Sequence, residues 1–230
     1  MPDQVWRDTL GDVDGNGFSL TDVPVVSAQE RAELQEIYDD DRRFRSTVVM
    51  ARHQFGEGEY RYFANPLPPV VERLRRDAYG PLAELANVWA ERLRSETRYP
   101  ADLDEFLAVC RRAGQNRPTP LLLRYEPGGW NALHQDLYGE VAFPLQLTVA
   151  LTEPGTDFTG GENLLVEQRP RAQSRGSSIT IPAGHALVFA TRDRPVRGTR
   201  GSHRTQMRHG VSTVTSGRRA TLGIIFHDAA

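Results

Sequence analysis

The spacing of hydrophobic residues along this chain is helical before Pro118 and strand-like after it. In the first part, apolar residues recur every three to four positions, which is the period of an amphipathic helix. The segment 44–63 differs, because it looks like a pair of strands around a Gly-rich turn. Helices are predicted over residues 27–38, over 68–94 with a break at Gly80-Pro81, and over 99–114.

The second part consists of short apolar runs separated by clusters of Gly, Pro and Ser. Examples are "TPLLLRYE", "FPLQLTVALTE", "ENLLVEQ", "SSITI", "HALVFA", "RHGVSTV" and "ATLGIIFH". Such a succession of short strands is typical of a barrel or sandwich. The pattern therefore predicts an α+β fold, with a mainly helical part over residues 1–116 packed on an all-β core over 117–230. No repeat or low-complexity linker divides them, so we expect a single domain over 1–230.

Composition narrows the class of protein. The chain has 230 residues, of which 39% are hydrophobic, enough for a full core. No apolar run approaches the roughly 20 residues of a membrane span, and the first ten residues lack the features of a signal peptide. The one cysteine, Cys110, cannot form an internal disulfide and is expected to be a small buried residue on a helix. We therefore expect a soluble cytoplasmic protein.

Charge is distributed unevenly. The net charge is only −2, but residues 1–168 carry 17 Arg against 28 acidic residues, whereas 169–219 carry 11 Arg against one. All the basic residues are arginine, so we give weight to their clustering and not to their identity. A basic segment thus belongs to an otherwise acidic chain.

A short acidic motif near the start resembles a calcium loop but lacks one ligand. "DVDGNG" at residues 12–17 has the opening of such a loop, yet its twelfth position is Val23, where a bidentate acid is required. We therefore expect these residues to form a turn that leads into "FSLTDVPVVS".

A metal site is predicted at the end of one strand of the β core. His134 and Asp136 are two positions apart, so in an extended segment both side chains face the same side. His209 begins another alternating stretch near the end of the core and supplies a third ligand. Two imidazoles and one carboxylate form the facial triad of non-haem Fe(II) sites, which leaves coordination positions open for substrates. A loop hydrogen bond would be the simpler explanation of the His-x-Asp triplet alone.

Further polar residues are expected around the same cavity. If the chain turns at Ser216-Gly217, Arg219 lies beside the His209 strand, where its guanidinium would hold a carboxylate through two hydrogen bonds. Strand alternation places Thr221 on the same face and Arg218 on the opposite one. Tyr125, on an earlier strand, would add a phenol, although a buried structural tyrosine is the alternative.

These residues together resemble the 2-oxoglutarate and Fe(II)-dependent dioxygenases, in particular their prolyl-hydroxylase-like branch. The resemblance rests on the order of Tyr125, Gly128, His134-x-Asp136, Gly160-Gly161-Glu162, His209 and Arg219-x-Thr221. More narrowly, "RPTPLLLRYEPGGWNALHQDLYGE", "FTGGE", "MRHGVSTVTSGRR" and "LGIIFHDA" look like a bacterial subfamily predicted to act on damaged or modified nucleic acid.

The resemblance implies a fold, an activity and cofactors. The β core would be a double-stranded β-helix (jelly roll), and the cofactors would be Fe(II), 2-oxoglutarate and O2. His134, Asp136 and His209 would bind the metal, and Arg219, Thr221 and Tyr125 would bind 2-oxoglutarate. The activity would couple decarboxylation of 2-oxoglutarate to hydroxylation or oxidative demethylation of a substrate. A hydroxylase of a small molecule, amino acid or peptide side chain is the alternative, and a non-enzymatic binding barrel is a third.

The basic segment before His209 is the sequence's indication of the substrate. Its charge would hold phosphates near the mouth of the site if it binds nucleic acid. The alternative is a solvated segment that pairs with the acidic first part of the chain. The arginines expected to contact nucleic acid are Arg192, Arg194, Arg197, Arg200 and Arg204.

Overall fold

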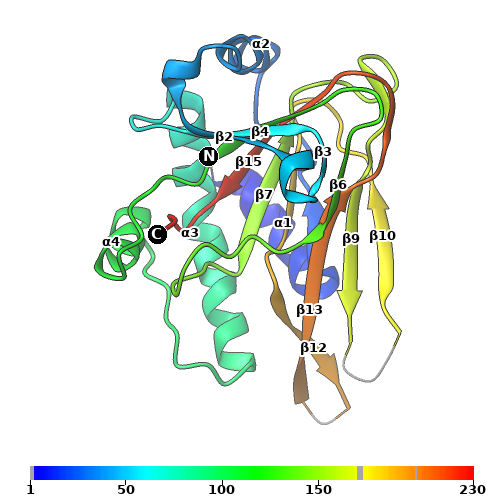
Figure 1. The fold of residues 1–230 in the computed structure, drawn as a ribbon. Helices are drawn as coiled ribbons and strands as arrows, with labels where there is room; N and C mark the ends of the chain where they lie inside the picture. Colours follow the sequence, from blue (N-terminus) through cyan, green and yellow to red (C-terminus); the bar gives the residue numbers. More distant parts are fainter. Residues whose placement is uncertain (1–2, 170–172, 200) are drawn as a thin grey trace.

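The computed structural model describes residues 3–169, 173–199 and 201–230 as a mixed α and β protein whose strands pair mainly antiparallel (Figure 1). Its helices are α1 (Gln4–Asn16), α2 (Ala28–Ile37), α3 (Pro69–Arg92) and α4 (Leu103–Arg112), with 3-10 turns at Asp41–Arg43 and Met50–His53.

Two antiparallel sheets contain nearly all of the strands in the described residues. The larger has the order β1 (Phe18–Leu20), β11 (Ala186–Ala190), β7 (Leu145–Ala150), β15 (Arg219–Ile225), β5 (Leu121–Tyr125), β4 (Glu59–Phe63) and β2 (Phe44–Val49). The other has the order β10 (Arg175–Ile179), β9 (Asn163–Gln168), β13 (Gly201–Val211), β6 (Trp130–His134) and β3 (Gly56–Glu57), with β12 (Asp193–Gly198) paired to β13. A small third sheet joins β14 (Val214–Gly217) to β8 (Phe158–Gly160).

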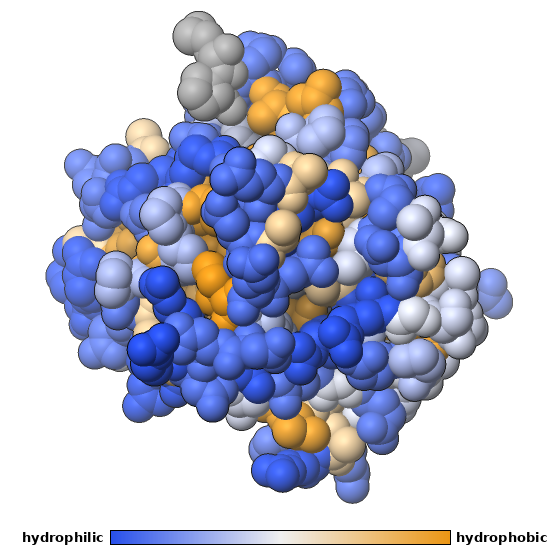
Figure 2. All heavy atoms as spheres, turned by 90° about the horizontal axis from the view of Figure 1, so that it is seen from above, coloured by the Kyte–Doolittle hydropathy of each residue, from blue (hydrophilic) through white to orange (hydrophobic). Residues whose placement is uncertain are grey.

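The main hydrophobic core joins the helices to the larger sheet. Trp6 and Val13 of α1, Leu74 and Trp89 of α3 and Phe106 of α4 belong to one buried cluster with residues of β7, β11 and β15. In Figure 1, β6, β9 and β10 stand to the right of β7 and β15, and the β12–β13 hairpin extends downward. Figure 2 shows a face on which hydrophilic residues predominate and hydrophobic residues are visible in hollows between them.

Two local predictions in the first part are wrong. Residues 12–16 form the last turn of α1, which ends at Gly17 in the left-handed conformation (φ 85°), so the calcium-like motif is the end of a helix and not the separate turn expected before "FSLTDVPVVS". The helix α3 continues through Gly80-Pro81. An internal proline costs about 3 kcal/mol, but the residues around it are buried, and their packing offsets that cost.

The sequence pattern missed α1, β1 and β12, but the other predicted helices and the strand pair of the first part are present. The segment 44–63 contains β2 and β4 as a pair, and α4 stops before Gly114, whose φ is 79°. Cys110 is fully buried on α4. Among the described residues, none of the helices combines the length and apolarity that a bilayer crossing requires.

Candidate metal centre

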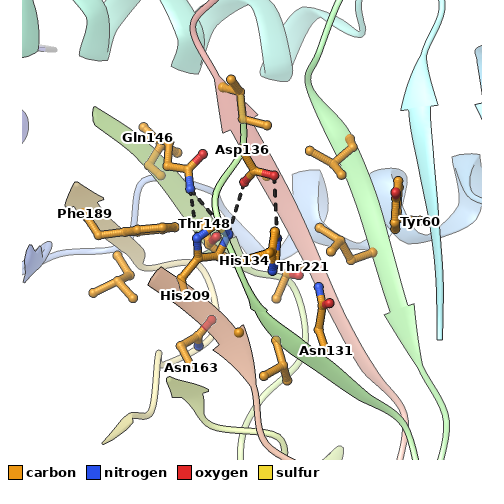
Figure 3. Close-up of a pocket in the computed structure, with 18 of the residues that line it drawn as sticks. Tyr60, Asn131, His134, Asp136, Gln146, Thr148, Asn163, Phe189, His209 and Thr221 are labelled. Atoms are coloured by element: carbon orange, nitrogen blue, oxygen red, sulfur yellow. Dashed lines mark hydrogen bonds and ion pairs between the residues drawn. The ribbon is translucent and has the colours of Figure 1, made fainter. Parts of the chain in front are cut away.

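Strands β6 and β13 bring the two histidines together. The strands pair antiparallel with His209 directly opposite His134, and their ring centres lie 4.1 Å apart. Asp136 follows the end of β6, and its carboxylate faces both imidazoles from one side (Figure 3). Its oxygens are 3.1 Å from His209 Nε2 and 3.6 Å from His134 Nε2. Ligand atoms of the three residues all lie within 4.8 Å of one another.

This spacing suits one metal ion. Neighbouring ligands with bonds of about 2.1 Å to an octahedral ion lie about 3 Å apart. The backbone carbonyl of Ala132 is 2.7 Å from His134 Nδ1, which leaves Nε2 free to face the centre. The arrangement therefore fits a small divalent cation with two nitrogen ligands and one oxygen ligand.

The protonation states also suit a metal. Burial and the nearby His209 imidazole lower the pKa of His134. Burial alone would raise the pKa of Asp136, but the two imidazoles and a hydroxyl donor hold it well below its usual range. A neutral imidazole beside a charged carboxylate is the form in which these side chains bind metal ions.

A tyrosine that the sequence did not single out orients the carboxylate. Tyr138 Oη donates a hydrogen bond of 2.6 Å to Asp136 Oδ1, and Tyr62 Oη donates to Tyr138 Oη at 3.0 Å. Burial and the neighbouring Asp136 raise the pKa of Tyr138, which keeps the phenol protonated as a donor. In the sequence, the position of Tyr138 two residues after Asp136 was the feature that could have indicated this contact.

Replacing Tyr138 with phenylalanine should lower metal affinity about 10- to 100-fold, as loss of an outer partner of a metal ligand typically does. Titration with Fe(II) under anaerobic conditions measures the change. Tyr60→Phe is the matched control, since Tyr60 lines the same cavity while the hydroxyl bonded to Asp136 is that of Tyr138. Equal metal affinity of Tyr138→Phe and the wild type would contradict the orienting role.

A second group of polar residues lies farther along the same cavity. Arg219 is only 2% exposed, and its Nη2 donates to Asn163 Oδ1 at 3.0 Å. Its Nη1 is buried and has no hydrogen-bond partner in the structure. Thr221, on the same face of β15, and Tyr125, opposite Arg219 on β5, also line the cavity. Arg218 is exposed and bonded to Glu126, as strand alternation predicts.

A glycine makes room for this arginine. At Gly161, φ is +67°, and an added Cβ would lie 2.8 Å from Arg219 Cδ, so any larger residue would displace the guanidinium. The next residue, Glu162, is bonded to Ser212 in three ways. Its backbone N–H donates to the Ser212 hydroxyl, its carboxylate accepts from that hydroxyl, and its backbone carbonyl accepts from the Ser212 N–H. The Gly160-Gly161-Glu162 motif thus connects β8 to β9 beside the site.

The cavity that contains these groups lies between the two sheets. Its volume is about 290 Å³. Apart from tyrosines, the titratable residues among the described lining of this cavity are His134, Asp136, His209 and Arg219. Among the described residues, the rest of its wall is aliphatic, aromatic or uncharged polar, and includes Phe55, Tyr60, Tyr62, Leu123, Phe189 and Ile225.

The predicted basic segment lies elsewhere. It forms the β12–β13 hairpin, and none of its arginines within the described residues lines the cavity. Arg194 is 3% exposed and donates to Glu167 at 2.9 Å and to backbone carbonyls at the end of α1. Its prediction as a phosphate contact is therefore wrong, because its guanidinium is already paired in the interior. Arg200 lies outside the described residues, and Arg197 is exposed on β12.

His227 and Asp228 diverge, as expected for adjacent residues. Burial lowers the pKa of His227 to about 4, and its Nδ1 accepts a hydrogen bond from the Phe143 amide. The Asp228 carboxylate accepts a hydrogen bond of 2.8 Å from Arg75. Both residues are held by separate structural contacts.

In sequence, this chain is similar to one family model and to individual proteins. The family model Oxygenase-NA, described as an oxygenase catalysing oxidative methylation of damaged DNA, matches residues 58–229. Two uncharacterized proteins of Mycobacterium tuberculosis, from strains CDC 1551 and H37Rv, are each 55% identical over 168 residues. The matched part is 73% of this chain and 72% of each relative.

Solved structures share the fold at low identity. A prolyl-4-hydroxylase of Pseudomonas putida is 14% identical with a TM-score of 0.55, over 98% of this chain and all of that one. An oxidoreductase of the 2OG-Fe(II) oxygenase family from Burkholderia pseudomallei is 15% identical with a TM-score of 0.57, over 98% and 93% of the two chains. A prolyl hydroxylase from Trichoplax adhaerens, solved with a hypoxia inducible factor peptide, is 14% identical with a TM-score of 0.57, over 99% and 90%.

Proposed function

Because the chain belongs to the Oxygenase-NA family, we propose that it is an Fe(II)- and 2-oxoglutarate-dependent dioxygenase that oxidises a modified base in DNA. The observation that carries this proposal is the His134, Asp136 and His209 cluster in one cavity with a buried, unpartnered arginine nitrogen. The two facing antiparallel sheets support a double-stranded β-helix core, and the cavity lined by residues of both sheets supports one oxygenase domain over 1–230.

The residues present fit both cofactors. Two imidazoles and a carboxylate form the donor set of non-haem Fe(II) sites with open positions. The unpartnered Nη1 of Arg219, beside Nη2 on the same guanidinium, suits one carboxylate of a dicarboxylic acid. Thr221, on the same face of β15, adds a hydroxyl to that end of the cavity.

Fe(II) with 2-oxoglutarate and O2 supplies the oxidant that replaces a substrate C–H bond with C–OH while 2-oxoglutarate becomes succinate and CO2. The residues of this chain determine where that chemistry acts. His134, Asp136 and His209 would hold the metal on one side, and Arg219 and Thr221 would fix the far carboxylate of 2-oxoglutarate. The aliphatic and aromatic part of the wall would limit the access of water once the co-substrates and substrate are bound. A hydroxyl group placed on an N-methyl carbon leads to loss of formaldehyde, which amounts to demethylation.

The cavity wall favours a flat, uncharged substrate group. Tyr60, Tyr62 and Tyr138 pack edge to face at one end of it, with Phe55 also in the lining. Aromatic side chains of this kind stack on nucleobases. Apart from Arg219 and the proposed metal ligands, no described lining residue carries a charge that could form an ion pair with the ammonium or carboxylate group of a free amino acid. The wall therefore favours a nucleobase over a free amino acid.

The substrate class can be tested by product formation. With Fe(II), 2-oxoglutarate and O2, single-stranded oligonucleotides that carry an N-methylated base should raise succinate formation well above the substrate-free rate, with formaldehyde released in equal amount. Unmethylated oligonucleotides of the same sequence are the control. The proposal fails if free amino acids or peptides stimulate succinate formation while every methylated oligonucleotide leaves it unchanged.

A further inference from the structure

A second cavity lies behind the loop that follows the metal centre. Its volume is about 480 Å³, and it is bounded by the end of α3, by α4, by residues 137–144 and by the segment that enters β12. Trp89, Tyr99 and Phe143 contribute aromatic surface to its wall. The cavity is therefore large enough, and aromatic enough, to accept a planar ring.

A buried hydroxyl group in this cavity has no hydrogen-bond partner. Thr191 is 1% exposed and lines the cavity, and its Oγ1 makes no hydrogen bond in the structure. Its backbone is fixed by a bond of 2.8 Å from its N–H to the Pro144 carbonyl. A buried hydroxyl without a partner costs free energy, so a ligand that bonds to it would recover that cost.

Three arginines give the same cavity an excess of positive charge. Arg192 and Arg204 share a single carboxylate, that of Asp193, at 3.0 and 3.7 Å. Within the described residues, the hydrogen bonds of Arg98 go to the backbone carbonyls of Ser95 and Thr97. Glu140 also lines the cavity and is exposed. With three guanidinium groups against two carboxylates, a phosphate would restore the balance of charge.

The two cavities share a wall of consecutive residues. Tyr138 lines the cavity of the metal centre and the exposed Leu137 lines the second one. A strand whose target base enters the first cavity would cross this short, exposed segment to reach the second. Two arginines of the basic segment, Arg192 and Arg204, thus line a neighbouring cavity and not that of the metal centre.

We propose that the second cavity binds a nucleotide flanking the target base of the same single-stranded DNA, with its phosphate on Arg98, Arg192 and Arg204 and a polar group on Thr191. This inference rests on the proposed function, because it assumes a polynucleotide substrate. It also assigns a role to the charge asymmetry of the sequence that the metal cavity leaves unexplained. Phosphate contacts would supply affinity, and the aromatic wall would add stacking.

Binding of a fluorescein-labelled single-stranded DNA ten nucleotides long, with one N-methylated base, tests the site. Anisotropy is measured on the full chain with Fe(II) and 2-oxoglutarate under anaerobic conditions, so that no turnover occurs. Arg98→Gln and Arg204→Gln should each raise Kd about 3- to 10-fold and reduce the slope of log affinity against log salt by about 0.7. Thr191→Val, which removes only the hydroxyl, should raise Kd about 2- to 10-fold.

The control is Arg112→Gln, an exposed arginine of α4 that is not part of the cavity lining. Arg98→Gln is the decisive variant, because Arg204 also contacts Asp193 and its loss could disturb the hairpin. If the oligonucleotide is oxidised but Arg98→Gln and Thr191→Val bind it like Arg112→Gln, this inference is overturned and the proposed function stands. If the wild type neither binds nor oxidises any methylated oligonucleotide, both fail.

Discussion

Asp136→Ala and His209→Ala should each reduce 2-oxoglutarate-dependent succinate formation to background. Each variant removes one of three ligand atoms that lie within 4.8 Å of one another. The loss should exceed the 10- to 100-fold that removal of an outer partner costs. Iron content after anaerobic loading and succinate release on exposure to O2 measure the two consequences separately.

His203→Ala is the matched control for this experiment. His203 lies on the same strand as His209, is exposed and does not line the cavity. Circular dichroism and thermal melting establish that the ligand variants remain folded. A folded variant that keeps both bound iron and wild-type turnover would remove its residue from the proposed centre.

Arg219→Ala should raise the concentration of 2-oxoglutarate needed for half-maximal rate about 30- to 1,000-fold. The variant removes a charge-assisted, two-pronged hydrogen bond to a desolvated carboxylate, which contributes about 2–4 kcal/mol. The structure strengthens this expectation, because Arg219 is buried in the cavity and its Nη1 is unpartnered without a ligand. Succinate formation against 2-oxoglutarate concentration gives the value.

Arg218→Ala is the adjacent control and should change this concentration little. Its side chain is 60% exposed and pairs with Glu126 at the surface, where such pairs contribute little. A large effect from Arg218→Ala together with a small one from Arg219→Ala would show that the other face of β15 meets the co-substrate.

At two places, tertiary packing produced a structure that differs from the one predicted by the local sequence pattern. Gly80-Pro81 predicted a break because an internal proline removes a backbone donor, yet buried neighbours on α3 keep the helix continuous. Arg194 looked like part of a basic surface because sequence clustering cannot show burial. In the fold its guanidinium pairs with Glu167 in the interior and holds the end of α1.

The sequence by itself determined the strand-rich second part and the residues of the proposed centre. Alternation along a strand has a period of two, so the spacing of Arg219 and Thr221 on β15 fixed that their side chains share a face. The same spacing indicated that His134 and Asp136 act together, although Asp136 lies just beyond the end of β6. Only the tertiary structure decided which distant groups meet. The antiparallel register places His209 opposite His134, the loop after β6 turns Tyr138 onto Asp136, and β12 meets the α3–α4 side to form the second cavity. These contacts depend on strand pairing and chain reversal between different segments of the chain. The local periodicity of the sequence predicts the type of each element but not which elements pair.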